Sequence, residues 1–186
     1  QTPLGSISVD QEALAALDQR LRASLGFGLE AVARDPEHAV EIELPFLQRI
    51  YPQGFQLIPL MVRDSTAHTA RNLGQALAET LRDRRAILVA STDLSHFYPQ
   101  PVAKKLDAVI LDRIEALDPA GVLQAEAEGR GFACGRGALA AVLWAAQALG
   151  ADQAVILKYA TSGDVTGDYS QVVGYAAAAL VRRGKS

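Results

Sequence analysis

The sequence predicts an α/β fold: a single domain with a mostly buried mixed or parallel sheet and helices on both faces. Segments with apolar residues at helical spacing alternate with short, continuously apolar segments typical of buried strands. The composition, 49% hydrophobic and 21% charged residues, is that of a globular protein. A length of 186 residues suits one domain with a substantial core, so a fold of this class needs no disulfide or metal to hold it together.

Two helices are predicted near the start of the chain. The first has Asp10 as its N-cap and Gly26 as its stop, and its apolar stripe is formed by Leu14, Leu17, Leu21 and Leu25. The second covers residues 36–52 and contains Pro45, whose missing N–H and bulky ring are expected to kink it.

The remaining elements alternate between strands and helices. Continuously apolar segments predict strands over residues 55–62, 86–91, 154–160 and 171–181. Apolar stripes predict helices that carry Leu73, Leu77 and Leu81, then Leu106, Ile110, Ile114 and Leu117. Residues 137–150 are almost all small and apolar, which predicts a helix buried on most sides.

Charge and composition exclude several classes of function. With 18 basic and 21 acidic residues, the net charge of −3 offers no broad attraction to nucleic acid. No apolar run reaches the roughly 20 residues of a membrane helix. The single cysteine forms no internal disulfide, which favours a reducing cytoplasm.

Polar residues gather where the predicted strand 86–91 ends. Asp93 and His96 follow it directly, at the strand end where α/β domains place ligands, and Asp93 could orient the imidazole of a general base or metal ligand. Equally, Asp93 could cap the turn and His96 could be a partly buried polar residue. The D-x-x-H spacing does not decide between these alternatives.

A second group of ionisable residues lies in the segment EHAVE, residues 37–41. On a helix, His38 and Glu41 are neighbours at i,i+3, and Glu37 lies one turn from Glu41. These residues form either a solvated helix face or a functional cluster. We expect His38 and Glu41 to face the same crevice as His96. His68 has no such neighbours and is expected at the surface.

Cys134 precedes a glycine-flanked arginine and an apolar helix. N–H groups at a helix start, together with Arg136, favour a thiolate that binds metal or acts as a nucleophile. A small buried hydrophobe is the alternative. The glycines on both sides of Arg136 indicate that the backbone approaches something closely.

The loop before the last strand is rich in glycine, aspartate and serine. Tyr159, Ser162, Asp164 and Asp168 are secondary site candidates, although ordinary turn chemistry also explains this composition.

Four ordered motifs carry a resemblance that spans nearly the whole chain: EHAVEIELPFL, ASTDLSHF, ACGRGALAAVLWAAQALG and YATSGDVTGDYSQVVGYAAAAL. Together they resemble the Memo family, in particular its prokaryotic branch, the AmmeMemoRadiSam system protein B. The resemblance implies a fold similar to class III extradiol dioxygenases, whose non-haem iron lies among histidines and an acidic residue. It also implies a bacterial source, and radical SAM and AMMECR-type proteins as partners.

The resemblance assigns roles to two residues. Cys134 matches the cysteine at the family's metal site, and His96 matches the histidine that serves as acid/base or ligand there. The family has two further site histidines, in segments that precede its T-P-L-G motif, and this chain begins at that motif. Two ligands, with Asp93 and His38 nearby, imply a weak site for iron, or alternatively for copper or zinc.

Two functions of different classes follow. One is a dioxygenase-like metal-dependent redox enzyme acting on an unknown substrate, with His96, Asp93, His38 and Glu41 as catalytic candidates. The other is a non-catalytic module that binds a peptide or protein at a vestigial crevice. We also expect a preceding segment to be missing, which would leave exposed Val, Ile and Leu side chains beside residues 86–91 or 154–160.

Overall fold

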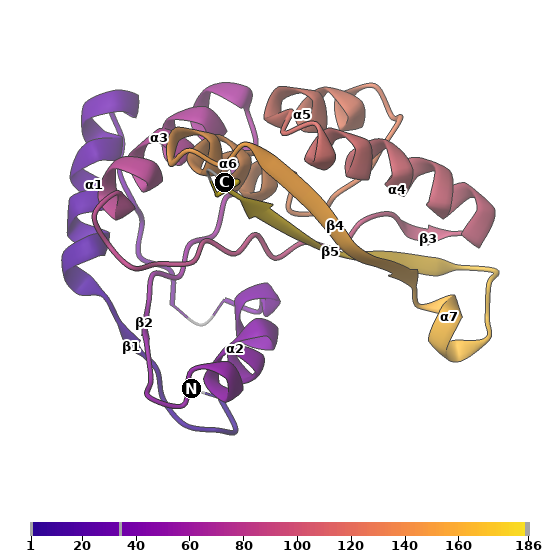
Figure 1. Ribbon diagram of the computed structural model, residues 1–186, viewed down its shortest axis with the longest axis horizontal. Helices are drawn as coiled ribbons and strands as arrows, with labels where there is room; N and C mark the ends of the chain where they lie inside the picture. The colour runs from indigo at the N-terminus through magenta and orange to yellow at the C-terminus, as the bar shows by residue number, and fades with distance from the viewer. Residues whose placement is uncertain (1, 34, 185–186) are drawn as a thin grey trace. The chain divides into compact units, whose positions relative to one another are not determined.

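A computed structural model describes residues 2–33 and 35–184 (Figure 1). The chain divides into two compact units, which we call the N-terminal unit (residues 1–61) and the C-terminal unit (residues 62–186). Both contain helices and strands, which confirms the α/β class.

In the N-terminal unit, residues 2–33 and 35–61 form two very short paired strands and two helices. β1 (Ser8–Val9) and β2 (Gln56–Leu57) are parallel. The helices are α1 (Gln11–Leu25) and α2 (Ala39–Ile50). The predicted strand over residues 55–62 is therefore reduced to two residues, and the helix predicted over residues 36–52 is shorter at both ends and continues through Pro45.

The ends of α1 are those predicted from the sequence. The Asp10 carboxylate accepts a hydrogen bond from the Ala13 N–H at 2.9 Å, which satisfies one of the free donors at the helix start. At the other end, Gly26 has a left-handed φ of 79° and donates its N–H to the Arg22 carbonyl. A residue with a side chain adopts this conformation less readily, so glycine ends the helix here.

Over its described residues, 62–184, the C-terminal unit contains five helices and a three-stranded antiparallel sheet in the order β3-β5-β4. Its helices are α3 (Ala67–Leu81), α4 (Gln100–Glu115), α5 (Pro119–Ala127), α6 (Arg136–Ala148) and α7 (Gly163–Thr166). Its strands are β3 (His96–Tyr98), β4 (Gln153–Thr161) and β5 (Val172–Val181).

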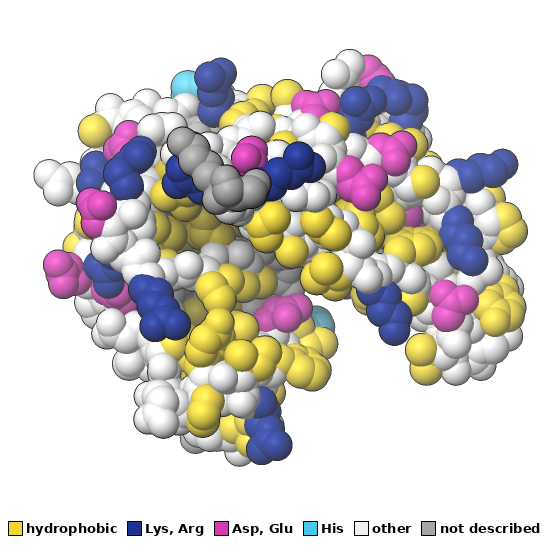
Figure 2. Space-filling model, viewed as in Figure 1, with side chains coloured by type: hydrophobic (Ala, Val, Ile, Leu, Met, Phe, Trp, Pro, Cys, Tyr) yellow, Lys and Arg dark blue, Asp and Glu magenta, His cyan; other side chains and the backbone are white. Residues whose placement is uncertain are grey.

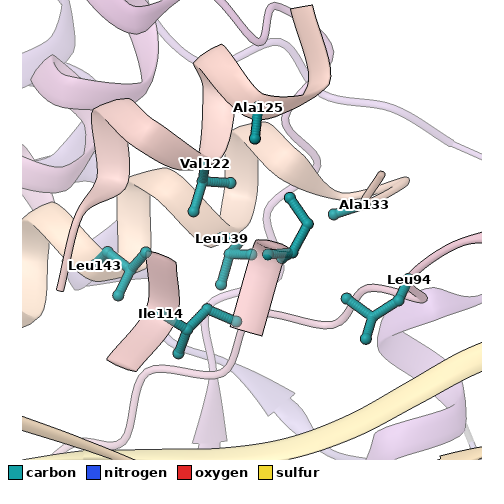
Figure 3. Packing of buried hydrophobic residues seen from close by; sticks show 8 residues of the cluster. Leu94, Ile114, Val122, Ala125, Ala133, Leu139 and Leu143 are labelled. Atoms are coloured by element: carbon teal, nitrogen blue, oxygen red, sulfur yellow. The ribbon is translucent and has the colours of Figure 1, made fainter. Parts of the chain in front are cut away.

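The core of this unit lies among α4, α5 and α6 and the sheet residues that pack on them (Figure 3). The cluster consists of Leu94, Ile110, Ile114, Val122, Ala125, Ala133, Leu139 and Leu143. Ile110, Val122 and Leu143 are fully buried, and each such side chain stabilises the fold by about 1.5–3 kcal/mol through loss of apolar contact with water.

Helices α3 and α6 pack at close range through small residues. A Cβ on Gly74 would lie 2.6 Å from the Ala141 carbonyl oxygen and 2.7 Å from the Cβ of Trp144. The small residues of α6 therefore serve helix packing, as the composition of residues 137–150 predicts.

The prediction of a strand over residues 86–91 is wrong. These residues form no regular structure, and no strand among residues 2–33 and 35–184 pairs with them. An apolar segment becomes a strand only when a neighbouring strand supplies ladder hydrogen bonds. Ile87 and Val89 are 65% and 51% exposed.

The strands also do not form one mostly buried sheet. β4 is an edge strand, and its Val155 and Leu157 are exposed, as are Tyr175 to Ala178 on β5. Exposed Val, Ile and Leu side chains thus line both segments for which we expected them. Figure 2 shows hydrophobic side chains (yellow) in patches between the charged ones on one face.

No helix in the described part of the chain is both long enough and apolar enough to cross a membrane.

Candidate functional site

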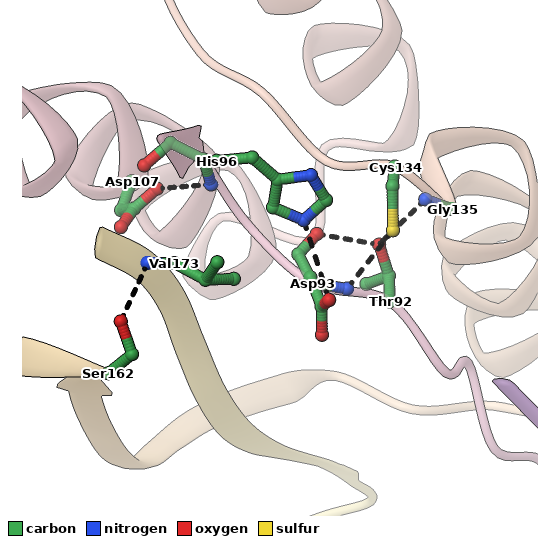
Figure 4. A network of polar contacts seen from close by, with 9 residues as sticks. Thr92, Asp93, His96, Asp107, Cys134, Gly135, Ser162 and Val173 are labelled. Carbon is green, nitrogen blue, oxygen red and sulfur yellow. Dashed lines mark hydrogen bonds and ion pairs between the residues drawn. The ribbon is translucent and has the colours of Figure 1, made fainter. Parts of the chain in front are cut away.

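Three of the predicted site residues come together in the C-terminal unit (Figure 4). One ligand atom from each of Asp93, His96 and Cys134 lies within 4.8 Å of the other two. Asp93 lies in the segment that leads into β3, His96 is the first residue of β3, and Cys134 lies two residues before α6. The site therefore joins two segments that are 41 residues apart, as measured from Asp93 to Cys134.

Backbone contacts hold Cys134 against Asp93. The Cys134 N–H donates to the Asp93 carbonyl at 3.2 Å, and the Asp93 N–H points at the Cys134 sulfur at 3.2 Å. The Cys134 residue is exposed. The alternative that Cys134 is a small buried hydrophobe is therefore wrong.

Thr92 completes this contact and was missed by the sequence reasoning. Its Oγ1 lies 3.5 Å from the Cys134 sulfur and accepts the Gly135 N–H at 2.7 Å. A Cβ on Gly135 would lie 2.9 Å from both the Ser91 carbonyl oxygen and the Thr92 Cβ. The close approach predicted from the glycines exists, and the approaching group is the segment that carries Asp93.

Arg136 pairs with a carboxylate. Its guanidinium forms an ion pair with Glu126 at 2.5 Å. Burial raises the pKa of Glu126, and Arg136 opposes that rise. Arg136 was expected to favour the thiolate form of Cys134. Among the described contacts, its guanidinium binds Glu126 and not the Cys134 sulfur. Gly137, the second flanking glycine, allows close approach to Ser65, whose Oγ would lie 2.7 Å from a Cβ there.

The imidazole of His96 turns a nitrogen without a hydrogen bond toward the site. Its Nε2 is buried and has no hydrogen-bond partner among the described residues, although Asp93 Oδ2 lies 3.4 Å away. The imidazole packs against the rings of Phe97 and Phe132, with centroids 5.7 and 5.4 Å away. Such a nitrogen is available to a ligand or a proton.

The backbone beside His96 is irregular. The register between β3 and β5 shifts between His96 and Tyr98, and Phe97 has a φ of 63°, in the left-handed region. A bulge of this kind re-aims side chains at the edge of a sheet. A left-handed residue with a side chain costs about 1–3 kcal/mol, which the surrounding contacts must offset.

His38 and Glu41 belong to the N-terminal unit, and both are exposed. His38 stands at the N-cap position of α2 without a side-chain cap, while the Glu37 carboxylate accepts the N–H groups of His38 and Ala39 at 2.8 Å. Glu37 thus has a helix-capping role. That His38 and Glu41 face the site of Cys134 stays a prediction.

The secondary candidates have mostly turn-forming roles. Ser162 accepts the Val173 N–H at 3.0 Å, Asp164 accepts the Thr161 N–H at 2.7 Å, and Asp168 accepts the Ser170 N–H at 2.9 Å. These contacts support the turn alternative. Tyr159 differs, because its hydroxyl donates to Asp107 at 2.7 Å. His68 is exposed on α3, as expected.

A surface hollow of about 600 Å³ lies in the N-terminal unit. It is lined by Ser6, Ile7, Ser8, Gln48, Gln53, Gly54, Phe55 and Gln56. None of these carries a titratable side chain, so this hollow offers no imidazole, thiolate or carboxylate for proton transfer or for ligation of a metal.

Comparison with known proteins agrees with the resemblance drawn from the motifs. A family model described as "Memo-like protein" matches residues 1–179. A MEMO1 family protein of Methanopyrus kandleri is 41% identical over 186 residues, which cover 99% of this chain and 64% of the relative. A MEMO1 family protein of Methanothermobacter thermautotrophicus is 39% identical over 178 residues, covering 95% and 63%.

A third relative, the MEMO1 family protein of Nitrosopumilus maritimus, is 34% identical over 177 residues. The chain spans a little under two thirds of the length of these archaeal relatives. A bacterial source therefore stays a prediction. Because the family model covers nearly the whole chain and the relatives agree with it, the chain belongs to the Memo-like protein family.

Proposed function

We propose that this chain carries a non-haem metal site for redox chemistry, with Asp93, His96 and Cys134 as its protein ligands and a small molecule or peptide as substrate. The observation that supports this most is the convergence of three ligand atoms of different chemistry within 4.8 Å. A turn or a packed core needs no such convergence.

The donor set suits a transition metal. Imidazole and thiolate favour iron, copper or zinc over magnesium or calcium, which prefer oxygen ligands alone. The buried Nε2 of His96 has no hydrogen-bond partner among the described residues, which is costly unless something binds it. Cys134 is exposed, which leaves one side of the site open to substrate. Iron is the metal we favour for redox chemistry, and copper is the alternative; zinc suits the same donors but has no redox chemistry of its own.

When bound, iron or copper would supply the redox chemistry, and Asp93, His96 and Cys134 would hold it. The surrounding residues have separate tasks. Thr92 and the Asp93 N–H fix the position of the sulfur through contacts of 3.5 and 3.2 Å. Phe97 and Phe132 flank the imidazole and limit its rotation. Without metal, His96 Nε2 can hold a proton that faces Asp93 Oδ2.

Metal binding by the full chain tests this function. Anaerobic titration with Fe²⁺, and parallel titrations with Cu⁺ and Zn²⁺, should give one tightly bound ion per chain after dialysis, measured by mass spectrometry of metal content. Cys134→Ala and His96→Ala should each weaken binding at least about tenfold, because each removes a ligand. His68→Ala, an exposed histidine of the same unit, is the matched control and should bind like the unaltered chain.

The proposal is wrong if none of the three metals binds stoichiometrically. It is also wrong if His68→Ala weakens metal binding as much as His96→Ala does. Either outcome would favour the non-catalytic module that binds a peptide or protein.

A further inference from the structure

Asp107 is a buried carboxylate in the apolar stripe of a helix. The buried positions of α4 are Ala103, Asp107, Ile110 and Ile114, which follow the helical repeat. Asp107 is 0% exposed. A carboxylate in such a position destabilises a fold unless hydrogen bonds satisfy it, so its presence calls for a specific role.

Both oxygens of Asp107 are used, and they bind different elements. Oδ1 accepts the Ser95 N–H at 2.8 Å, and Oδ2 accepts the Tyr159 hydroxyl at 2.7 Å. Burial and the neighbouring carboxylate raise the pKa of Tyr159, so that the hydroxyl keeps its proton and remains a donor. Asp107 therefore joins α4, the residue before β3, and β4.

Gly174 makes room for this carboxylate. A Cβ at Gly174 would lie 2.0 Å from Asp107 Oδ2. The same glycine continues the pairing of the sheet beyond β3, because its carbonyl accepts the Leu94 N–H and its N–H donates to the Ser95 carbonyl, both at 2.9 Å. Backbone and carboxylate contacts thus meet at Ser95.

Ser95 is adjacent to His96, and the position of Ser95 is not fixed by a hydrogen bond of its own side chain. Within the described residues the buried Ser95 hydroxyl has no hydrogen-bond partner. On the other side of His96, Phe97 has a left-handed backbone and the strand register is irregular. The Nε2 of the imidazole forms no hydrogen bond among these residues, and Asp93 Oδ2 lies 3.4 Å from it. Besides the flanking rings of Phe97 and Phe132, the backbone before His96 therefore sets the direction of its side chain.

We infer that Asp107 is a positioning residue for the metal site: through Ser95 it sets the backbone from which His96 reaches toward Asp93 and Cys134, and Tyr159 and Gly174 hold Asp107 in place. The inference rests on the proposed function, and it also makes a claim about His96 that holds without metal. Asp107 contacts neither a metal nor a substrate in this scheme.

The test compares variants of the full chain by two measurements. Asp107→Ala removes both acceptors, whereas Asp107→Asn keeps a carbonyl oxygen for the Ser95 N–H. Tyr159→Phe leaves the Ser95 contact intact and removes only the second donor. Ile110→Val is the matched control, since it alters the next buried position of α4 and leaves the carboxylate untouched.

The first measurement needs no metal. In NMR spectra, the nuclear Overhauser contact between the rings of His96 and Phe132 should be present in the unaltered chain, in Ile110→Val and in Asp107→Asn. It should be lost or weakened severalfold in Asp107→Ala. Tyr159→Phe should fall between them. Asp107→Asn removes the carboxylate but keeps an acceptor for the Ser95 N–H. If this variant keeps the ring contact that Asp107→Ala loses, the contact depends on that acceptor and not on a general loss of folding.

The second measurement is the affinity for Co²⁺, followed by the thiolate-to-cobalt absorption band. Asp107→Ala should weaken Co²⁺ binding about tenfold or more, as loss of residues that orient metal ligands does. Asp107→Asn and Ile110→Val should stay within about threefold of the unaltered chain.

The two claims fail in different ways. If the unaltered chain binds none of Co²⁺, Fe²⁺, Cu⁺ and Zn²⁺ while Asp107→Ala still loses the ring contact, the proposed metal function fails and the positioning role stands. If Asp107→Ala keeps both the ring contact and the Co²⁺ affinity shown by Ile110→Val, the positioning role is wrong.

Discussion

Gly135 shows how one missing side chain shapes the site. A Cβ at this position would lie 2.9 Å from backbone and side-chain atoms of Ser91 and Thr92. We expect Gly135→Ala to destabilise the chain by about 1–3 kcal/mol, because the clash involves atoms that cannot move freely. Urea unfolding measures this. The variant should also bind Co²⁺ more weakly, since Cys134 is displaced from the Asp93 N–H.

Gly184→Ala is the control for this change, as a Cβ there meets nothing within 4 Å. It should match the unaltered chain in both measurements. Equal unfolding midpoints for Gly135→Ala and Gly184→Ala would contradict the steric explanation.

Asp164 gives a prediction about pH. The Thr161 N–H is the largest cause of a lowered pKa for this exposed carboxylate, with the Thr161 and Gln100 side chains adding to it. A pKa that is lower in the folded state means that the unfolded chain binds more protons in the window between the two values, so stability rises with pH there. The contribution is fully present above about pH 3.9, the ordinary value for aspartate, and is lost as the pH falls through the folded value.

Asp164→Asn should therefore be less stable than the unaltered chain at neutral pH, and the difference should shrink as the pH falls below about 3.9. Urea midpoints at several pH values measure it. Asp83→Asn, at another exposed position, serves as the comparison. A difference that stays constant with pH would show that the charge of Asp164 does not matter.

At the scale of elements, the contact between α3 and α6 gives the clearest prediction. Gly74→Ala would raise helix propensity by about 1 kcal/mol in an exposed helix. Here the new Cβ would meet the Ala141 carbonyl oxygen at 2.6 Å, so we expect a net loss of about 1–3 kcal/mol instead. Thermal unfolding followed by circular dichroism measures it.

Gln75→Ala is the control, because Gln75 lies one residue further along α3 on its exposed side. It should change the free energy of unfolding by no more than about 0.5 kcal/mol. If Gly74→Ala proves more stable than the unaltered chain, the helices are not packed as closely as described.

Sequence patterns predicted elements well where the signal is local. Asp10 and Gly26 mark the ends of α1 because a cap and a left-handed turn depend on adjacent residues only. The segment 86–91 has the composition of a strand, but pairing depends on a distant partner, which its own residues do not encode. Asp107 was overlooked because the apolar stripe of α4 was assigned through Leu106, while Asp107 is the buried position.

The same reasoning applies to the site. Local patterns left Asp93, His96 and Cys134 with structural alternatives, and the family resemblance assigned site roles to His96 and Cys134. The contacts of Cys134 with Thr92 and of His96 with Phe132 join residues some forty positions apart, for which no short pattern exists.

At the scale of the whole molecule, the exposed apolar edge of the sheet should govern self-association. Leu157 on the edge strand β4 is 65% exposed. Unprotected apolar edges promote pairing between chains, and lysine at such positions prevents it. We expect Leu157→Lys to reduce self-association of this chain, measured by light scattering over a range of concentrations, with little change in melting temperature.

Val165→Lys is the control, because Val165 is 89% exposed but lies on α7, outside the sheet. If both substitutions reduce association equally, added charge rather than the strand edge is the cause.

The contact between the Asp93 N–H and the Cys134 sulfur spans 41 residues, and this separation has a thermodynamic consequence. The three ligand side chains are dispersed in the unfolded chain and lie together only in the folded one, so a metal bound by all three would bind the folded state more tightly than the unfolded state. Binding and folding are then linked, and an ion at a hundred times its dissociation constant would add about 2.7 kcal/mol to the free energy of unfolding. The melting temperature would thereby serve as a measure of metal affinity.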